Sequence, residues 1–159
     1  LGATSSWEAL PLQVDSTVGG AAALFPRVAG GAGGHAAVVW RDTVGGKRSV
    51  YASIYTPGSG WSAADLLEDN DDYDCESADV TLDPAGNAVA VWYRHDGTLF
   101  RTWAARYSGG AWQPEIQVST AERHAWEPFV AGDAVGGMVC AWYLSSAALE
   151  NDIRAAWFQ

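Results

Sequence analysis

Positive charge is scarce in this 159-residue chain. Nine lysines and arginines stand against nineteen aspartates and glutamates, which gives a formal net charge of −10 at pH 7. Such an acidic surface repels the phosphate backbone of nucleic acids. The single lysine, Lys47, and the dispersed arginines leave no basic cluster for an anionic membrane surface. The charge balance therefore argues against nucleic acid as a partner and favours solubility.

Long hydrophobic runs are missing as well. No stretch reaches 18 consecutive apolar residues, so the sequence predicts no membrane insertion. Hydrophobic residues nevertheless make up 48% of the chain, which excludes disorder. The length suits one globular domain over residues 1–159. The first residue is Leu1 and no signal peptide can be read, which indicates an N-terminus that is processed, trimmed or cut from a longer protein.

Cysteine occurs only twice, at Cys75 and Cys140. In an oxidising compartment the two side chains would form one disulfide between neighbouring units, provided that their Cα atoms lie within about 7 Å. The alternative is a pair of buried, inert thiols.

Catalytic motifs are also absent from the sequence. The histidines show no His-x-His or His-Glu-x-x-His spacing, and neither a Gly-x-Ser-x-Gly motif nor a phosphate-binding glycine loop occurs. We therefore predict that the protein is not an enzyme.

What the chain does contain is an internal repeat of about 50 residues. Three segments align without gaps, and their closing residues Trp40, Trp92 and Trp142 lie 52 and 50 residues apart. A second recurring block has a small pair at its centre, and a third opens with tryptophan. The three kinds of block are residues 26–40, 78–92 and 128–142; residues 49–55, 101–107 and 152–158; and the segments led by Trp7, Trp61 and Trp112. The repeat units are therefore about 7–60, 61–111 and 112–159.

Each unit is predicted to form four short strands. Turn-forming residues at 31–34, 83–87 and 133–137 accept the positive φ angles of tight hairpins. The apolar run at 88–92 lacks strict alternation, which indicates a strand buried on both faces. Four-stranded units of this length are typical of β-propeller blades. We therefore predict an all-β fold, a β-propeller with three four-stranded blades per chain.

Three blades are too few to close a ring, because propellers have four to eight. The repeat begins with the strand led by Trp7 and ends after a small-pair strand, so the two ends are complementary. Two chains related by a two-fold axis would make six blades, the first strand of each completing the last blade of the other. We predict this six-bladed homodimer. The alternatives are part of a longer propeller and a monomeric β-trefoil, which has the same threefold repeat.

Residues 79–92 resemble the blade repeats of secreted bacterial propellers, including the sialidase-like and propeller-lectin groups. The resemblance covers nearly the whole chain and concerns the blade pattern. The Asp-box of sialidases, Ser-x-Asp-x-Gly-x-x-Trp, is absent, so sialidase activity does not carry over, and the Gln-x-Trp motif of ricin-type trefoil lectins is absent too. The resemblance implies a secreted or cell-surface bacterial protein that binds carbohydrate.

Residues that interrupt the repeat are the best candidates for binding, since the repeated tryptophans are expected to pack the blades. Trp126 is such an interruption, and its indole would stack on a sugar ring or, alternatively, plug a gap between blades. The loops after the closing tryptophans fall on the same face and offer donors, acceptors and rings, although ordinary solvated loops are the alternative. The predicted ligand-binding residues are Trp126, His124, Tyr93, His95, Asp96, Arg41, Asp42 and Tyr143.

The run at 68–74 holds five acids in seven residues, which repel one another unless water or a cation neutralises them. Calcium prefers such oxygen ligands, although the glycine and the final glutamate of an EF-hand loop are missing. The candidate calcium ligands are Asp69, Asp71, Asp72 and Asp74, and a solvated loop is the alternative. No other cofactor is expected.

Together these observations predict a non-enzymatic, lectin-like protein with glycans and a second copy of itself as partners. Several weak sites on one rigid ring would gain avidity for a glycan-coated surface. A structural or protein-interaction module of a larger extracellular assembly is the alternative. A glycoside hydrolase is the least favoured class, because no carboxylate pair is evident.

Overall fold

The computed structural model describes residues 11–16, 18–19, 22–69, 72–120, 123–145 and 151–158. Over these ranges the chain consists of β-strands and one 3₁₀ turn, Ala32–Gly34, without an α-helix. The strands form three antiparallel sheets, none of them closed into a barrel. The all-β prediction is therefore confirmed. None of the helical residues in these ranges belongs to a helix long and apolar enough to cross a membrane.

The three sheets repeat one strand order. Sheet A consists of β1 (Leu24–Gly30), β2 (Ala36–Val44), β3 (Lys47–Thr56), β4 (Gly60–Trp61) and β5 (Asp65–Leu66), the last two both paired with β3. Sheet B consists of β6 (Cys75–Leu82), β7 (Ala88–His95), β8 (Phe100–Ser108), β9 (Ala111–Trp112) and β10 (Ile116–Gln117), the last two both paired with β8. Sheet C consists of β11 (His124–Gly132), β12 (Met138–Ser145) and β13 (Asn151–Phe158).

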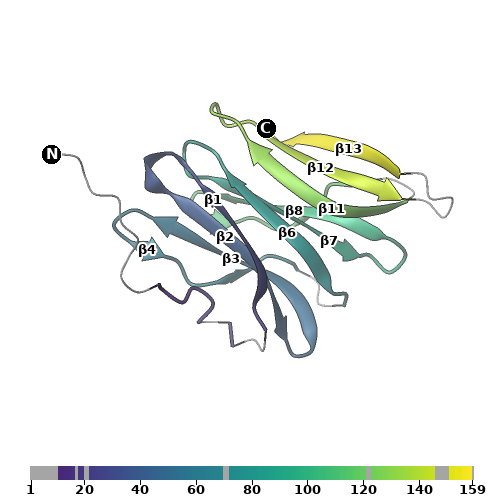
Figure 1. Ribbon diagram of the computed structural model, residues 1–159, viewed down its shortest axis with the longest axis horizontal. Helices are drawn as coiled ribbons and strands as arrows, with labels where there is room; N and C mark the ends of the chain where they lie inside the picture. The colour runs from purple at the N-terminus through teal and green to yellow at the C-terminus, as the bar shows by residue number, and fades with distance from the viewer. Residues whose placement is uncertain are drawn as a thin grey trace.

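The sheets pack face to face, with sheet B in the middle (Figure 1). Their first strands, β1, β6 and β11, lie side by side, and the later strands of each sheet follow in order away from them. This arrangement explains why residues 88–92 of β7 are all buried, since both faces of the middle sheet are covered. The apolar run without alternation correctly predicted a strand buried on both sides.

Two apolar clusters hold the sheets together. Successive residues of β7 point to opposite neighbours, because side chains alternate along a strand. Ala90 and Trp92 join the cluster between sheets A and B, whereas Val89 and Val91 join the cluster between sheets B and C. Alternate side chains of β7 therefore pack into the two interfaces.

An aspartate organises the tight turn after β6, and another organises the turn after β11. One carboxylate oxygen of Asp83 accepts hydrogen bonds from the backbone N–H groups of Ala85 at 2.8 Å and Asn87 at 2.9 Å. Burial opposes ionisation of Asp83, but its hydrogen bonds with Asn87 and Ala85 lower its pKa overall. Asp133 makes the same pattern at the third turn, accepting from Val135 and Gly137. These side chains provide the turn chemistry that the sequence indicated.

The two cysteines are free and buried, as the alternative of two inert thiols expects. Cys75 belongs to the cluster between sheets A and B, and Cys140 belongs to the cluster between sheets B and C. The intervening sheet B therefore separates the two thiols. Burial raises the pKa of Cys140 to about 12, and it also raises the pKa of Cys75.

We expect neither thiol to react with Ellman's reagent in the folded protein at pH 8, because attack requires an accessible thiolate. Both Cys75 and Cys140 should react after denaturation in guanidinium without reductant. Counting reactive thiols before and after denaturation checks this result. A fast-reacting thiol in the folded protein would contradict the burial, and no reactive thiol after denaturation would reveal a disulfide.

Candidate functional site

A hollow of about 280 Å³ lies at the end of the sheets where β7 ends and β8 and β11 begin. Side chains from all three sheets converge there. We call it the aromatic hollow, and its lining consists of Arg48, Tyr73, Asp74, Glu76, Tyr93, His95, Phe100 and Trp126. Residues far apart in sequence meet at this point because the sheets present the same ends to it.

The aromatic wall of the hollow centres on Trp126. Its ring lies 4.1 Å from that of Phe100, centroid to centroid, and 5.2 Å from that of Tyr93 in an edge-to-face arrangement. The indole N–H donates a hydrogen bond to the hydroxyl of Ser145 at 2.9 Å. His124 accepts a hydrogen bond from the backbone N–H of Phe100 and holds the neighbouring edge. The cluster thus fixes the orientation of Trp126 and covers part of its surface.

The opposite wall is charged. Arg48 donates a hydrogen bond to Asp74 at 2.7 Å and also forms an ion pair with Glu76. The hydrogen bond from Arg48 lowers the pKa of Asp74, outweighing the opposing effect of burial. Glu76 pairs in turn with Arg41. Two carboxylates and two guanidinium groups therefore form one network with little net charge.

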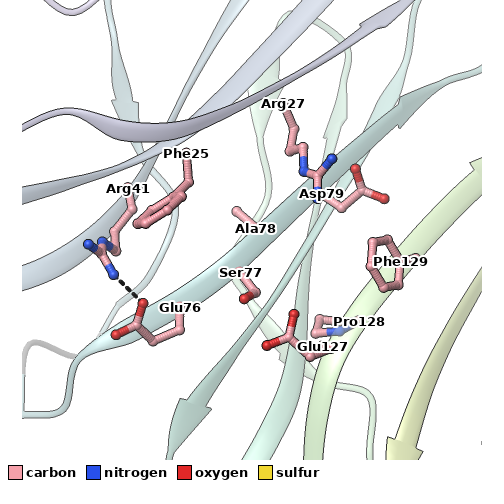
Figure 2. A pocket seen from close by; sticks show the side chains of 10 residues that line it. All are labelled: Phe25, Arg27, Arg41, Glu76, Ser77, Ala78, Asp79, Glu127, Pro128 and Phe129. Atoms are coloured by element: carbon pink, nitrogen blue, oxygen red, sulfur yellow. Dashed lines mark hydrogen bonds and ion pairs between the residues drawn. The ribbon is translucent and has the colours of Figure 1, made fainter.

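A second cavity, of about 180 Å³, lies beside the hollow between the first strands of the sheets (Figure 2). Glu76 borders both cavities. We call this one the bulge cavity, because β1, β6 and β11 each contain a register shift at its wall. The shifts place Phe25, Ser77 and Glu127 at φ angles of 56°, 47° and 47°, which non-glycine residues rarely adopt. All three residues line the cavity and occupy equivalent positions of the repeat.

The bulge cavity is lined by charges of both signs. Arg41 of β2 reaches Glu76 across its rim, and the Arg41 guanidinium lies 4.7 Å from the ring centroid of Phe25 (Figure 2). One carboxylate oxygen of Asp79 accepts a hydrogen bond from the backbone N–H of Val130 at 2.9 Å, which ties β6 to β11.

The predicted ligand-binding residues divide into three groups. Tyr93, His95 and Trp126 line the aromatic hollow and His124 contacts its wall, so the structure brings these four together. Arg41 lines the bulge cavity instead. The others do not line either cavity.

Three predicted residues, Asp42, Asp96 and Tyr143, lie outside the two cavities. Asp42 is buried and accepts hydrogen bonds from the backbone N–H groups of Thr43 and Ala22. Asp96 accepts from Thr98, Leu99 and Arg101, bonds that lower its pKa although burial opposes this. Tyr143 pairs with Trp126 in the β11–β12 register and is half-buried.

Sequence reasoning missed several residues of the hollow, including Tyr73, Glu76 and Phe100. One signal was available for Glu76, because it occupies the repeat position that holds Trp126 in the third unit. Trp126 was selected because its position holds different residues in the three units, and the same reason selects Glu76. No comparable signal pointed to Phe100.

The described part of the acidic run holds no assembled metal site. Asp71 lies outside the described residues, and Asp74 is engaged by Arg48. The Asp69 N–H and the Asp72 carbonyl face Glu115 and Lys47, respectively. Across the described ranges, no three histidine, cysteine, aspartate or glutamate residues gather closely enough to hold an ion.

The chain matches no known protein family, and no curated protein is significantly similar to it in sequence. The rings of the aromatic hollow offer apolar faces and edges, its carboxylates accept hydrogen bonds, and Arg48 donates them. That combination suits binding of a polar, uncharged molecule.

Proposed function

We propose that the protein is a lectin-like β-propeller module that binds a glycan in the aromatic hollow. The observation that carries the proposal is the convergence of four aromatic rings, one imidazole ring and a charged network in one open hollow. A sugar presents C–H groups that pack on rings and hydroxyls that bond to carboxylates and guanidinium groups. Binding without catalysis is the role that we assign to this site.

The charge of the hollow favours a neutral glycan. Asp74 and Glu76 are both paired with Arg48, and Glu76 is also paired with Arg41, so two guanidinium groups balance the two carboxylates. Phosphate-rich ligands are disfavoured by the net charge of −10 on the chain. A neutral sugar demands hydrogen bonds without a net countercharge, which this network supplies.

The arrangement of the sheets supports the propeller architecture over the β-trefoil. Three separate sheets with one strand order pack face to face, and their first strands lie together. A trefoil would instead join strands from its three repeats into a barrel, and none of these sheets is closed. The blade pattern shared with secreted bacterial propellers supports a secreted or cell-surface location.

The test is a broad glycan array followed by affinity measurements on two histidine variants. We expect His95→Ala to weaken glycan binding about tenfold or more, because His95 lines the hollow. His35→Ala is the matched control, since His35 is also half-buried but lies in the β1–β2 turn at the opposite end of the sheets. Binding to no glycan, or equal losses in the two variants, would contradict the proposal.

A further inference from the structure

Strand β13 lacks the outer strands that cover its counterparts in the other sheets. Within the described ranges, β4 and β5 pair with β3 at the edge of sheet A, and β9 and β10 pair with β8 at the edge of sheet B. No strand in these ranges pairs with the outer side of β13, which is the edge of sheet C. Trp61 and Trp112 lie opposite Tyr55 and Tyr107 in these pairings. Phe158 of β13 occupies the repeat position of Tyr55 and Tyr107, so the repeat predicts a third tryptophan opposite Phe158.

The outer strands join their sheets in the same way each time. In sheet A the backbone N–H of Ser62, the residue after Trp61, donates to the carbonyl of Ile54 at 2.8 Å. In sheet B the backbone N–H of Gln113, the residue after Trp112, donates to the carbonyl of Arg106 at 2.7 Å. The equivalent residue of β13 is Trp157, whose side chain is 68% exposed. Ile153 on the same strand is 77% exposed. Such an uncovered apolar edge is a template for an added strand.

An apolar cavity of about 180 Å³ adjoins this edge, between sheets B and C. Its lining consists of Val89, Val91, Ala104, Ile116, Val118, Val130, Cys140, Ala156, Trp157 and Phe158. At the corresponding place between sheets A and B, Trp112 packs against the core cluster beside Tyr107. The cavity therefore lies where the tryptophan of a further outer strand would pack.

The sequence contains one further segment of the required kind. Residues 12–14, Leu-Gln-Val, begin five positions after Trp7, and residues 116–118, Ile-Gln-Val, begin four positions after Trp112, so the two segments share one apolar-polar-apolar pattern with a single inserted residue. Residues 116 and 117 form β10, and Ile116 and Val118 line the cavity. In this structure residues 11–14 form no strand, and Leu12 is 66% exposed. Residues 11–14, the described part of the segment led by Trp7, therefore resemble an outer strand but pair with no sheet in this structure.

We propose that the segment led by Trp7 of a second copy adds to the edge of β13 and places its indole in this apolar cavity. The exchange is reciprocal, so two copies related by a two-fold axis each complete the other's sheet C. Main-chain hydrogen bonds supply affinity, and the cavity supplies specificity for tryptophan.

The faces of the outer sheets fit the same assembly. Val89 and Val91 of sheet B pack against sheet C, and their equivalents Val139 and Ala141 lie on the face of sheet C that points away from sheet B. Sheet B packs against sheet A through Ala90 and Trp92, and the equivalent positions of sheet A hold Val38 and Trp40. Docking of sheet C on the partner's sheet A would therefore repeat an interface that the chain already uses twice, and it would require the contacts that bury Trp40, which is 3% exposed in the single chain, to rearrange. Dimerisation by this exchange does not depend on glycan binding.

The first test is the mass of the full chain by light scattering at tens of micromolar protein. We expect a dimer, twice the 16.8 kDa chain mass. Trp7→Ala and Val14→Asp should each weaken dimerisation at least tenfold, because the first removes the indole and the second places a charge at the apolar residue that matches Val118 in the Ile-Gln-Val segment. Gln13→Asp is the matched control, since Gln117, its match in the Ile-Gln-Val segment, is exposed. Circular dichroism confirms that each variant is folded.

A second measurement keeps the proposal falsifiable if a variant fails to fold. An excess of a synthetic peptide of residues 1–16 should convert the wild-type dimer into monomers, each with one bound peptide. A monomeric wild-type chain, an open series of larger oligomers, or a dimer insensitive to the peptide would overturn the proposal. A dimer insensitive to both Trp7→Ala and Val14→Asp would overturn it as well. His95→Ala should leave the dimer intact, so failure here is distinguishable from failure of the glycan proposal.

Discussion

Glu115→Ala is expected to lower the free energy of unfolding by about 3–5 kcal/mol, because it breaks a buried ion pair. The carboxylate of Glu115 lies 2.7 Å from the guanidinium of Arg94, and the two side chains are only 6% and 3% exposed. Burial raises the pKa of Glu115 even though Arg94 opposes the shift, which shows how strongly the site disfavours an isolated charge. Removing the carboxylate leaves the Arg94 charge buried without this countercharge.

Urea denaturation of Glu115→Ala, of Arg94→Met and of the double variant Arg94→Met/Glu115→Leu measures the effect. The double variant should lose less than the sum of the single losses, since it leaves neither charge behind. The Arg94 guanidinium also lies 4.4 Å from the ring centroid of Trp103, so Arg94→Met loses that contact as well. Additive losses in the double variant would show that the pair does not act as a unit.

Trp92→Ala is expected to cost about 3–5 kcal/mol, the range for removing a buried aromatic side chain. Trp92 is fully buried in the cluster between sheets A and B, so its loss leaves a cavity that rigid sheets do not refill. The measurement is again the free energy of unfolding in urea.

Trp92→Phe is the control for the Trp92 prediction. The indole N–H of Trp92 has no hydrogen-bond partner within the described part of the chain, so phenylalanine loses volume without losing a hydrogen bond. We expect a cost of about 1–2 kcal/mol for this smaller change. Equal costs for the two variants would mean that the ring does not carry the packing of the interface.

Much of the fold could be predicted from the sequence because its determinants are local and occur three times. The continuous apolar run at 88–92 indicated a strand covered on both faces, and β7 lies in the middle sheet. The aspartate turn at 83–87 is formed by hydrogen bonds within five residues. Patterns of this kind are visible without knowledge of which sheet packs on which.

The candidate site was less predictable because it depends on which partner each polar side chain finds. Tyr93, His95 and Trp126 were identified from their place after a closing tryptophan or at a break in the repeat. Asp42 and Asp96 satisfied similar criteria, but backbone N–H groups nearby engage both carboxylates. Residue type and position along the chain do not reveal such local competition.

The three bulges have a consequence for how this scaffold could diversify. One backbone geometry presents a phenyl ring at Phe25, a hydroxyl at Ser77 and a carboxylate at Glu127 to the same cavity. The backbone there tolerates an apolar, a polar and an acidic side chain without altering its course. The three bulge positions therefore accept different side chains, and exchanging the side chains among them would change the lining of the cavity without changing the backbone.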